Sequence, residues 1–160
     1  MTDRGSPGQV AAMLSVIVDA AEDEGERLTQ LLAALTGAAV DGLVREVLIA
    51  GGGPAELLKI LREETGANLA GTLRGAIGVS KSDRLLVLRT DFRPRGGWTV
   101  ELGGHLRAGG GEAVVKGEGG GFLRAAPYAV LIGREKARAL LHPDLRRLRR
   151  VLGKRADRIG

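Results

Sequence analysis

The sequence predicts an α/β protein with a mostly parallel sheet and helices on both faces. Short aliphatic, β-branched runs recur along the chain, segments with helical leucine spacing follow them, and glycine or proline stands between the two. Continuous apolar runs are typical of strands that are buried on both faces. Strands that alternate with helices predict parallel pairing through right-handed crossovers.

The apolar runs give the predicted strands. In chain order they are Leu14–Val18, Val44–Ala50, Arg84–Leu88, Ala113–Lys116 and Ala129–Ile132. The fourth lies within a glycine-rich stretch, 109–121, that we expect to be mobile.

Leucine spacing and end signals give the predicted helices. They are Glu26–Leu35, Ala55–Thr65, Leu73–Val79, Trp98–Arg107, Arg134–Leu141 and Asp144–Leu152. Pro54 suits the first position of the second helix, and Gly66 is its C-terminal stop.

Composition excludes several kinds of site. The chain has 160 residues, which suits one domain, and only 2% are aromatic, so the core is aliphatic. The absence of cysteine excludes disulfides and thiolate metal sites. His105 and His142 lack ligand spacing, which argues against zinc, and no G-x-S-x-G motif supports a serine hydrolase.

We expect three segments: a disordered stretch 1–12, a nucleotide-sugar-binding domain 13–141 and a basic amphipathic helix within 142–160. No apolar run approaches the roughly 18–20 residues that cross a bilayer. Val10–Val18 lacks the basic flank of a signal peptide, so we interpret it as part of a buried strand and the protein as cytoplasmic.

Charge divides the chain into an acidic and a basic half. Residues 1–70 hold 11 acidic and 5 basic side chains, and residues 71–160 hold 8 acidic and 19 basic side chains. The C-terminal segment has a leucine stripe and seven basic residues, Arg146, Arg147, Arg149, Arg150, Lys154, Arg155 and Arg158. Its simplest interpretation is a core-docked helix with a solvated basic face. The alternatives are a helix on anionic lipid at the inner face of the membrane, or a nucleic-acid contact, against which the lack of interleaved aromatics argues.

The loops after the first three strands are where we expect a ligand, because parallel sheets bind ligands beyond their carboxyl ends. Gly51-Gly52-Gly53 could hold a phosphate at a helix N-terminus or simply form a tight turn. Glu56 stands where a dinucleotide fingerprint needs its third glycine. Asp91 could bind Mg²⁺ or Mn²⁺, or serve as a turn residue. Glu22 and Asp23 could complement a helix dipole or hydrogen-bond a base or ribose.

The same segments resemble family-two glycosyltransferases, inverting enzymes of the three-layer, Rossmann-like GT-A fold. SVIVD at 15–19 resembles their first strand, and LVREVLIAGG at 43–52 resembles their second strand and its loop. LLVLRTD at 85–91 resembles the strand with the metal-binding D-x-D motif, of which Asp91 remains and Arg89 replaces the first acid. Pro94 and Gly97-Trp98 match a P-x-x-G-W pattern.

This resemblance implies that the protein binds a nucleotide-diphosphate sugar and transfers the sugar to an acceptor. It implies a nucleotide site at Glu22, Asp23, Gly51, Gly52, Glu56 and Arg89. It also implies Mg²⁺ or Mn²⁺ on Asp91 and a catalytic base at Asp144. The alternative is a catalytically inactive homologue that acts as a scaffold or regulatory partner through the basic C-terminal helix.

Overall fold

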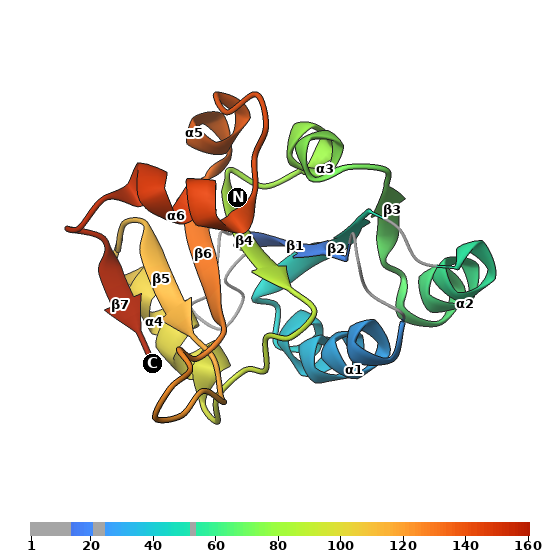
Figure 1. Ribbon diagram of the computed structural model, residues 1–160, viewed down its shortest axis with the longest axis horizontal. Helices are drawn as coiled ribbons and strands as arrows, with labels where there is room; N and C mark the ends of the chain where they lie inside the picture. Colours follow the sequence, from blue (N-terminus) through green and yellow to red (C-terminus); the bar gives the residue numbers. More distant parts are fainter. Residues whose placement is uncertain (1–13, 21–24, 52–53) are drawn as a thin grey trace, which may run out of the picture.

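One seven-stranded sheet forms the centre of the molecule (Figure 1). The computed structural model describes residues 14–20, 25–51 and 54–160. The strands are β1 (Leu14–Asp19), β2 (Val44–Ala50), β3 (Asn68–Ala70), β4 (Arg84–Arg89), β5 (Ala113–Lys116), β6 (Tyr128–Gly133) and β7 (Asp157–Ile159). Their order across the sheet is β3-β2-β1-β4-β6-β5-β7.

The sheet is mostly parallel. Strands β3, β2, β1 and β4 pair in parallel, whereas β6 runs antiparallel to both of its neighbours, β4 and β5. Strand β7 then pairs in parallel with β5 at the far edge. The predicted fold class is therefore confirmed.

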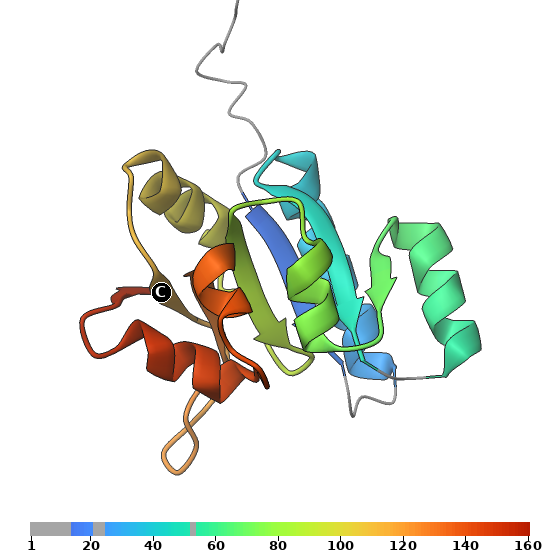
Figure 2. The same cartoon turned by 90° about the horizontal axis from the view of Figure 1, so that it is seen from above.

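Helices cover both faces of the sheet and complete three layers (Figures 1 and 2). They are α1 (Glu26–Val40), α2 (Ala55–Thr65), α3 (Leu73–Val79), α4 (Trp98–Arg107), α5 (Arg134–Arg138) and α6 (Leu145–Leu152). Helices α1, α2 and α4 share one aliphatic core with the sheet, and α3, α5 and α6 share the core on the other face.

Strand β1 explains why the apolar runs are continuous. Its first five residues are all buried, with Val16 and Val18 in one core and Ile17 in the other. Each such side chain contributes roughly 1.5–3 kcal/mol on burial. The polar exception, Ser15, donates a hydrogen bond of 2.6 Å from its hydroxyl to Oε2 of Glu46 on β2.

The elements differ from expectation mainly in their ends. Helix α1 continues to Val40, and α5 ends at Arg138 rather than Leu141. The C-terminal segment is helical only over Leu145–Leu152, after which the chain returns to the sheet as β7. No helix in the described ranges is long and apolar enough to cross a membrane.

Candidate functional site

The carboxyl ends of three parallel strands meet at one edge of the sheet. Asp19, the last residue of β1, is in register with Ala50 of β2 on one side and with Arg89 of β4 on the other. The loops after these strands therefore begin side by side, as the alternation of strands and helices predicted.

A hollow of about 480 Å³ opens at this edge. Arg89, Asp91 and Asp144, three of the residues that the sequence singled out, line it together with Asp19. Its other wall is Ala125, Ala126, Pro127, Tyr128, Leu145 and Arg146. Three carboxylates and two guanidiniums thus face one space, which we call the rim hollow.

Asp91 is held in place by its neighbours. Phe92 beside it is fully buried, and the Phe92 N–H donates to the carbonyl of Arg89 at 3.1 Å. The Arg93 guanidinium donates to the carbonyls of Thr90 and Phe92, both at 2.7 Å. Asp91 thus lies in a turn closed by the Phe92 N–H and the Arg89 carbonyl, as its alternative interpretation expected. Its exposed carboxylate makes no hydrogen bond or ion pair with any residue the structure describes.

Asp144 caps helix α6. Its Oδ1 accepts a hydrogen bond of 2.8 Å from the Arg147 N–H, and its Oδ2 lies 3.5 Å from Nε of Arg147. A side-chain cap of this kind typically stabilises a helix by about 1 kcal/mol. Asp144 therefore has a structural role at the mouth of the rim hollow, and its side chain is still half exposed.

Gly51 is the one residue of the predicted glycine turn that the structure describes, and it directly follows β2. Gly51 has a φ of 99°, and its N–H donates to the Ala70 carbonyl at 3.1 Å, so this amide is already used within the sheet. Glu56 is exposed in the first turn of α2 and does not line the rim hollow. Glu22, Asp23 and Gly52 lie outside the described residues.

The rim hollow carries too few protein ligands to hold a metal by itself. Within the part of the chain that the structure describes, no group of three or more His, Cys, Asp or Glu could hold a metal ion. Mg²⁺ and Mn²⁺ can nevertheless bind through one or two carboxylates when substrate phosphates complete the coordination. Asp91 and Asp19 both line the rim hollow and are carboxylates of the kind that such a cation binds.

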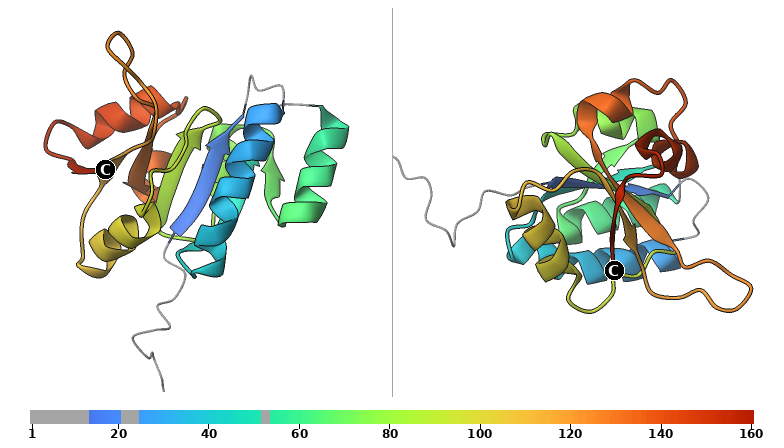
Figure 3. Two further views of the ribbon diagram at one scale, coloured as in Figure 1. Left: turned by 90° about the horizontal axis from the view of Figure 1, so that it is seen from below. Right: turned by 90° about the vertical axis from the view of Figure 1, so that its left-hand side faces the viewer.

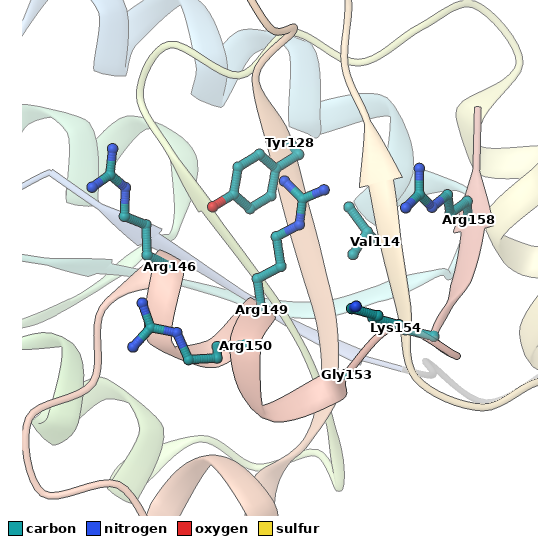
Figure 4. A pocket seen from close by; sticks show the side chains of 9 residues that line it. Val114, Tyr128, Arg146, Arg149, Arg150, Gly153, Lys154 and Arg158 are labelled. Carbon is teal, nitrogen blue, oxygen red and sulfur yellow. The ribbon is translucent and has the colours of Figure 1, made fainter.

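A basic surface adjoins the rim hollow. Two further hollows, of about 820 and 450 Å³, are lined by Arg95, Lys116, Arg124, Arg146, Arg149, Arg150, Lys154 and Arg158 and by no acidic residue. Tyr128 borders all three hollows. The Arg149 guanidinium lies 4.5 Å from the centre of the Tyr128 ring, the geometry of a cation–π contact (Figure 4).

Helix α6 docks on the core by its leucine stripe. Leu145 is 6% exposed and Leu148 is fully buried, and both belong to the core shared with α3 and α5. The structure therefore shows the simplest of the three interpretations of this segment, a docked helix with a solvated basic face. Leu145 and Leu148 are therefore not available for contact with lipid, whereas Val151 of the same helix is 37% exposed.

The sequence did not identify the wall of the rim hollow. Pro127 immediately precedes the antiparallel strand β6, Tyr128 is the first residue of that strand, and Arg146 comes from α6. Neither periodicity nor spacing tells which edge of a sheet a distant helix or an inserted antiparallel strand will reach. Asp19 was visible at a strand end, and its place between two other strand ends is the signal that could have found it.

No family model and no curated protein sequence matches this chain. Solved structures share its fold. The bifunctional IspDF from Campylobacter jejuni superposes with a TM-score of 0.60 at 8% identity, over 92% of this chain and 49% of that one. The 4-diphosphocytidyl-2C-methyl-D-erythritol synthase from Anaerococcus prevotii gives 0.59 at 11% identity, over 92% and 87%.

Glucosyl-3-phosphoglycerate synthase from Mycobacterium tuberculosis is also similar. Its complex with Mn²⁺, uridine diphosphate and glucosyl-3-phosphoglycerate gives a TM-score of 0.52 at 18% identity, over 81% of this chain and 60% of that one. This chain thus spans about half to nine-tenths of the structures it matches. At these identities the likeness establishes the fold, a Rossmann-like α/β fold shared by a cytidylyltransferase and a GT-A glycosyltransferase.

Proposed function

We propose that this protein binds a nucleotide-diphosphate sugar in the rim hollow and transfers the sugar to an acceptor. The observation that carries the proposal is the meeting of Arg89 and Asp91 with Asp144 around one hollow, although Asp144 lies far from the other two in the sequence. Family-two membership, suggested by the segments around 15–19, 43–52 and 85–91, is part of the proposal. The shared fold supports it, since both a nucleotidyltransferase and a Mn²⁺- and UDP-bound glucosyltransferase have this architecture.

Each residue of the rim hollow has a proposed role. Asp91, with Asp19 as a second carboxylate, would hold Mg²⁺ or Mn²⁺ together with diphosphate oxygens, and the cation would stabilise the charge on the leaving group. Arg89 and Arg146 would bind diphosphate oxygens through charged hydrogen bonds. The nucleotide contacts predicted for Glu22, Asp23, Gly51, Gly52 and Glu56 remain predictions.

Asp144 would act as the general base. The acceptor hydroxyl gives its proton to the Asp144 carboxylate while its oxygen forms a bond to the anomeric carbon of the sugar. The bond from that carbon to the diphosphate oxygen breaks, and the nucleoside diphosphate leaves with the electron pair. Attack opposite to the leaving group inverts the anomeric centre.

Calorimetric titration with UDP and GDP, each with and without Mn²⁺, tests nucleotide binding. We expect Mn²⁺-dependent binding at micromolar to low-millimolar affinity, and loss of the Mn²⁺ dependence in Asp91→Ala. The control is Glu101→Ala, which removes an acid from the first turn of α4, outside the rim hollow. Equal Mn²⁺ dependence in Asp91→Ala and the parent protein would remove Asp91 from the site.

The substitution Asp144→Asn separates catalysis from capping. Asparagine caps helices about as well as aspartate but cannot accept the acceptor's proton, so we expect turnover of a nucleotide sugar to fall by about a hundredfold or more at unchanged thermal stability. Nucleotide binding without turnover in the parent protein would favour the second candidate, an inactive homologue. That candidate is favoured by Arg89, which replaces an acid of the D-x-D motif, and by the Arg147 contacts that engage Asp144.

A further inference from the structure

The loop between β5 and β6 carries two large apolar side chains at its tip. It projects from the body of the domain (Figures 2 and 3). Gly121 and Arg124 close the tip by exchanging two backbone hydrogen bonds, of 2.8 and 3.3 Å, which leaves Phe122 and Leu123 as the two turn residues. Phe122 is fully exposed, and Leu123 is 90% exposed.

These residue types are unusual at the tip of a two-residue turn. Glycine, asparagine, aspartate and serine dominate such positions, because they tolerate the backbone geometry and are readily solvated. The chain has only two phenylalanines, and the other, Phe92, is fully buried in the core. Nothing in the fold requires Phe122 and Leu123 at the tip, since they pack against no core.

The basic surface begins at the base of this loop. Gly119, Gly120, Gly121 and Arg124 line the 450 Å³ hollow together with Arg149 and Arg158. None of the eight basic residues of the surface forms an ion pair within the described part of the chain. An apolar tip beside unpaired guanidinium and ammonium groups therefore forms one continuous surface.

We infer that this surface docks the protein on an anionic lipid bilayer. Phe122 and Leu123 enter the boundary between headgroups and acyl chains, and the basic side chains contact lipid phosphates from the hollows beside them. A bilayer supplies both requirements together, an apolar layer for the tip and a dense array of negative charge for the basic surface. The docking element is the loop, and α6 contributes only its solvated charges. The rim hollow, which shares Tyr128 and Arg146 with the basic surface, then lies beside the bilayer.

Vesicle co-sedimentation of the full chain tests this inference. We expect the protein to pellet with vesicles of phosphatidylcholine and phosphatidylglycerol and to stay in solution with phosphatidylcholine alone. Added salt should release it, because salt screens the contribution of the charges. Absence of sedimentation with the anionic vesicles would overturn the inference.

Two double variants distinguish insertion of the loop tip from nonspecific hydrophobic adsorption to vesicles. Phe122→Ser with Leu123→Ser should weaken vesicle binding by about tenfold or more, because both side chains lose a buried position in the bilayer. The matched control is Val100→Ser with Val79→Ser, which removes two exposed apolar side chains of α4 and α3 and should leave binding unchanged. Equal weakening by both pairs would overturn the assignment of the loop.

The charges have a matched control as well. Arg150→Gln with Lys154→Gln should weaken binding by about 25-fold, since each charge near an anionic surface is worth about a fivefold change. Lys59→Gln with Arg62→Gln makes the same change in net charge on α2, at the other end of the sheet, and should have little effect. Loss of binding in both pairs would mean a nonspecific charge effect and would overturn the proposed surface.

A direct signal comes from Phe122→Trp. A tryptophan inserted in the bilayer is quenched by brominated lipid, whereas Trp98 packs against the core and supplies the background in the parent protein. Unquenched fluorescence in pelleted protein would overturn insertion of the tip.

Two further measurements separate the possible outcomes. The affinity of the Phe122→Ser, Leu123→Ser variant for UDP reports on the rim hollow, so failure of docking is distinguishable from failure of the proposed function. Tight binding of a single-stranded oligonucleotide without vesicle binding would reassign the basic surface to nucleic acid.

Discussion

The two ends of the sheet are built differently. Around β1, β2 and β4 the strands have six or seven residues, pair in parallel and are covered on both faces. Around β5 and β7 the strands have four and three residues, and α6 packs mainly on β6 and β4. Val114 of β5 is therefore left to line the basic hollows. The first region is covered on both faces of the sheet, whereas in the second region part of one sheet face lines the basic hollows.

The largest expected effect contrasts the cores of the two regions. Ile17→Ala removes a fully buried side chain from the central strand and should lower the free energy of unfolding by about 2–5 kcal/mol. Ile159→Ala, in the edge strand β7, should cost about 2 kcal/mol or less, because its neighbours can relax into the space. Chemical denaturation measures both values. Equal losses would show that the edge region is as tightly packed as the centre.

A glycine at the junction of the two regions gives the next largest effect. A Cβ added to Gly117 would lie 2.9 Å from both the Arg93 carbonyl oxygen and the Phe92 ring, so we expect Gly117→Ala to lower stability by about 1–3 kcal/mol. Gly111→Ala is the control, because nothing lies within 4 Å of its added Cβ. A neutral Gly117→Ala, measured by thermal unfolding, would mean that the two regions adjust freely against each other.

The smallest effects sharpen the comparison between helices. Gly37 in α1 and Gly104 in α4 have open space around an added Cβ, so alanine at either position should raise stability by about 0.5–1 kcal/mol through helix propensity. Similar gains would show that helices in both regions fold as part of one cooperative unit. A gain confined to Gly37→Ala in thermal melts would show that the α4 region unfolds separately.

The strands of the fully covered region were predictable because burial on both faces leaves a continuous apolar run. Predicted Leu14–Val18 and Arg84–Leu88 fall short of the observed β1 and β4 by one residue. The strands β3 and β7 were missed because each has three residues and at most one is buried, which leaves no periodic signal.

Helix α5 ends before the predicted Leu141. Pro143 disfavours helical geometry at the preceding residue, which limits how far a helix can extend there.

The sequence predicted the position of the rim hollow, but not the full set of residues that line it. Strand alternation placed Asp91 near other strand ends, and only the family resemblance drew attention to Asp144. Their meeting depends on the antiparallel insertion of β6, which brings Tyr128 and α6 to this edge. Such an insertion has no local sequence signal, because it depends on which of the later strands pairs with the free edge of β4.

The insertion of β6 beside β4 also has a consequence during protein synthesis, because the two strands are made at different times. Strand β4 is complete at Arg89, but its second neighbour, β6, begins only at Tyr128. At roughly 5–20 residues per second, the ribosome takes about 2–8 s to make the residues between them. Throughout that interval β4 is an unpaired edge in the nascent chain, able to pair with other chains. A strand at the centre of the finished sheet thus has a free edge for several seconds of the protein's synthesis.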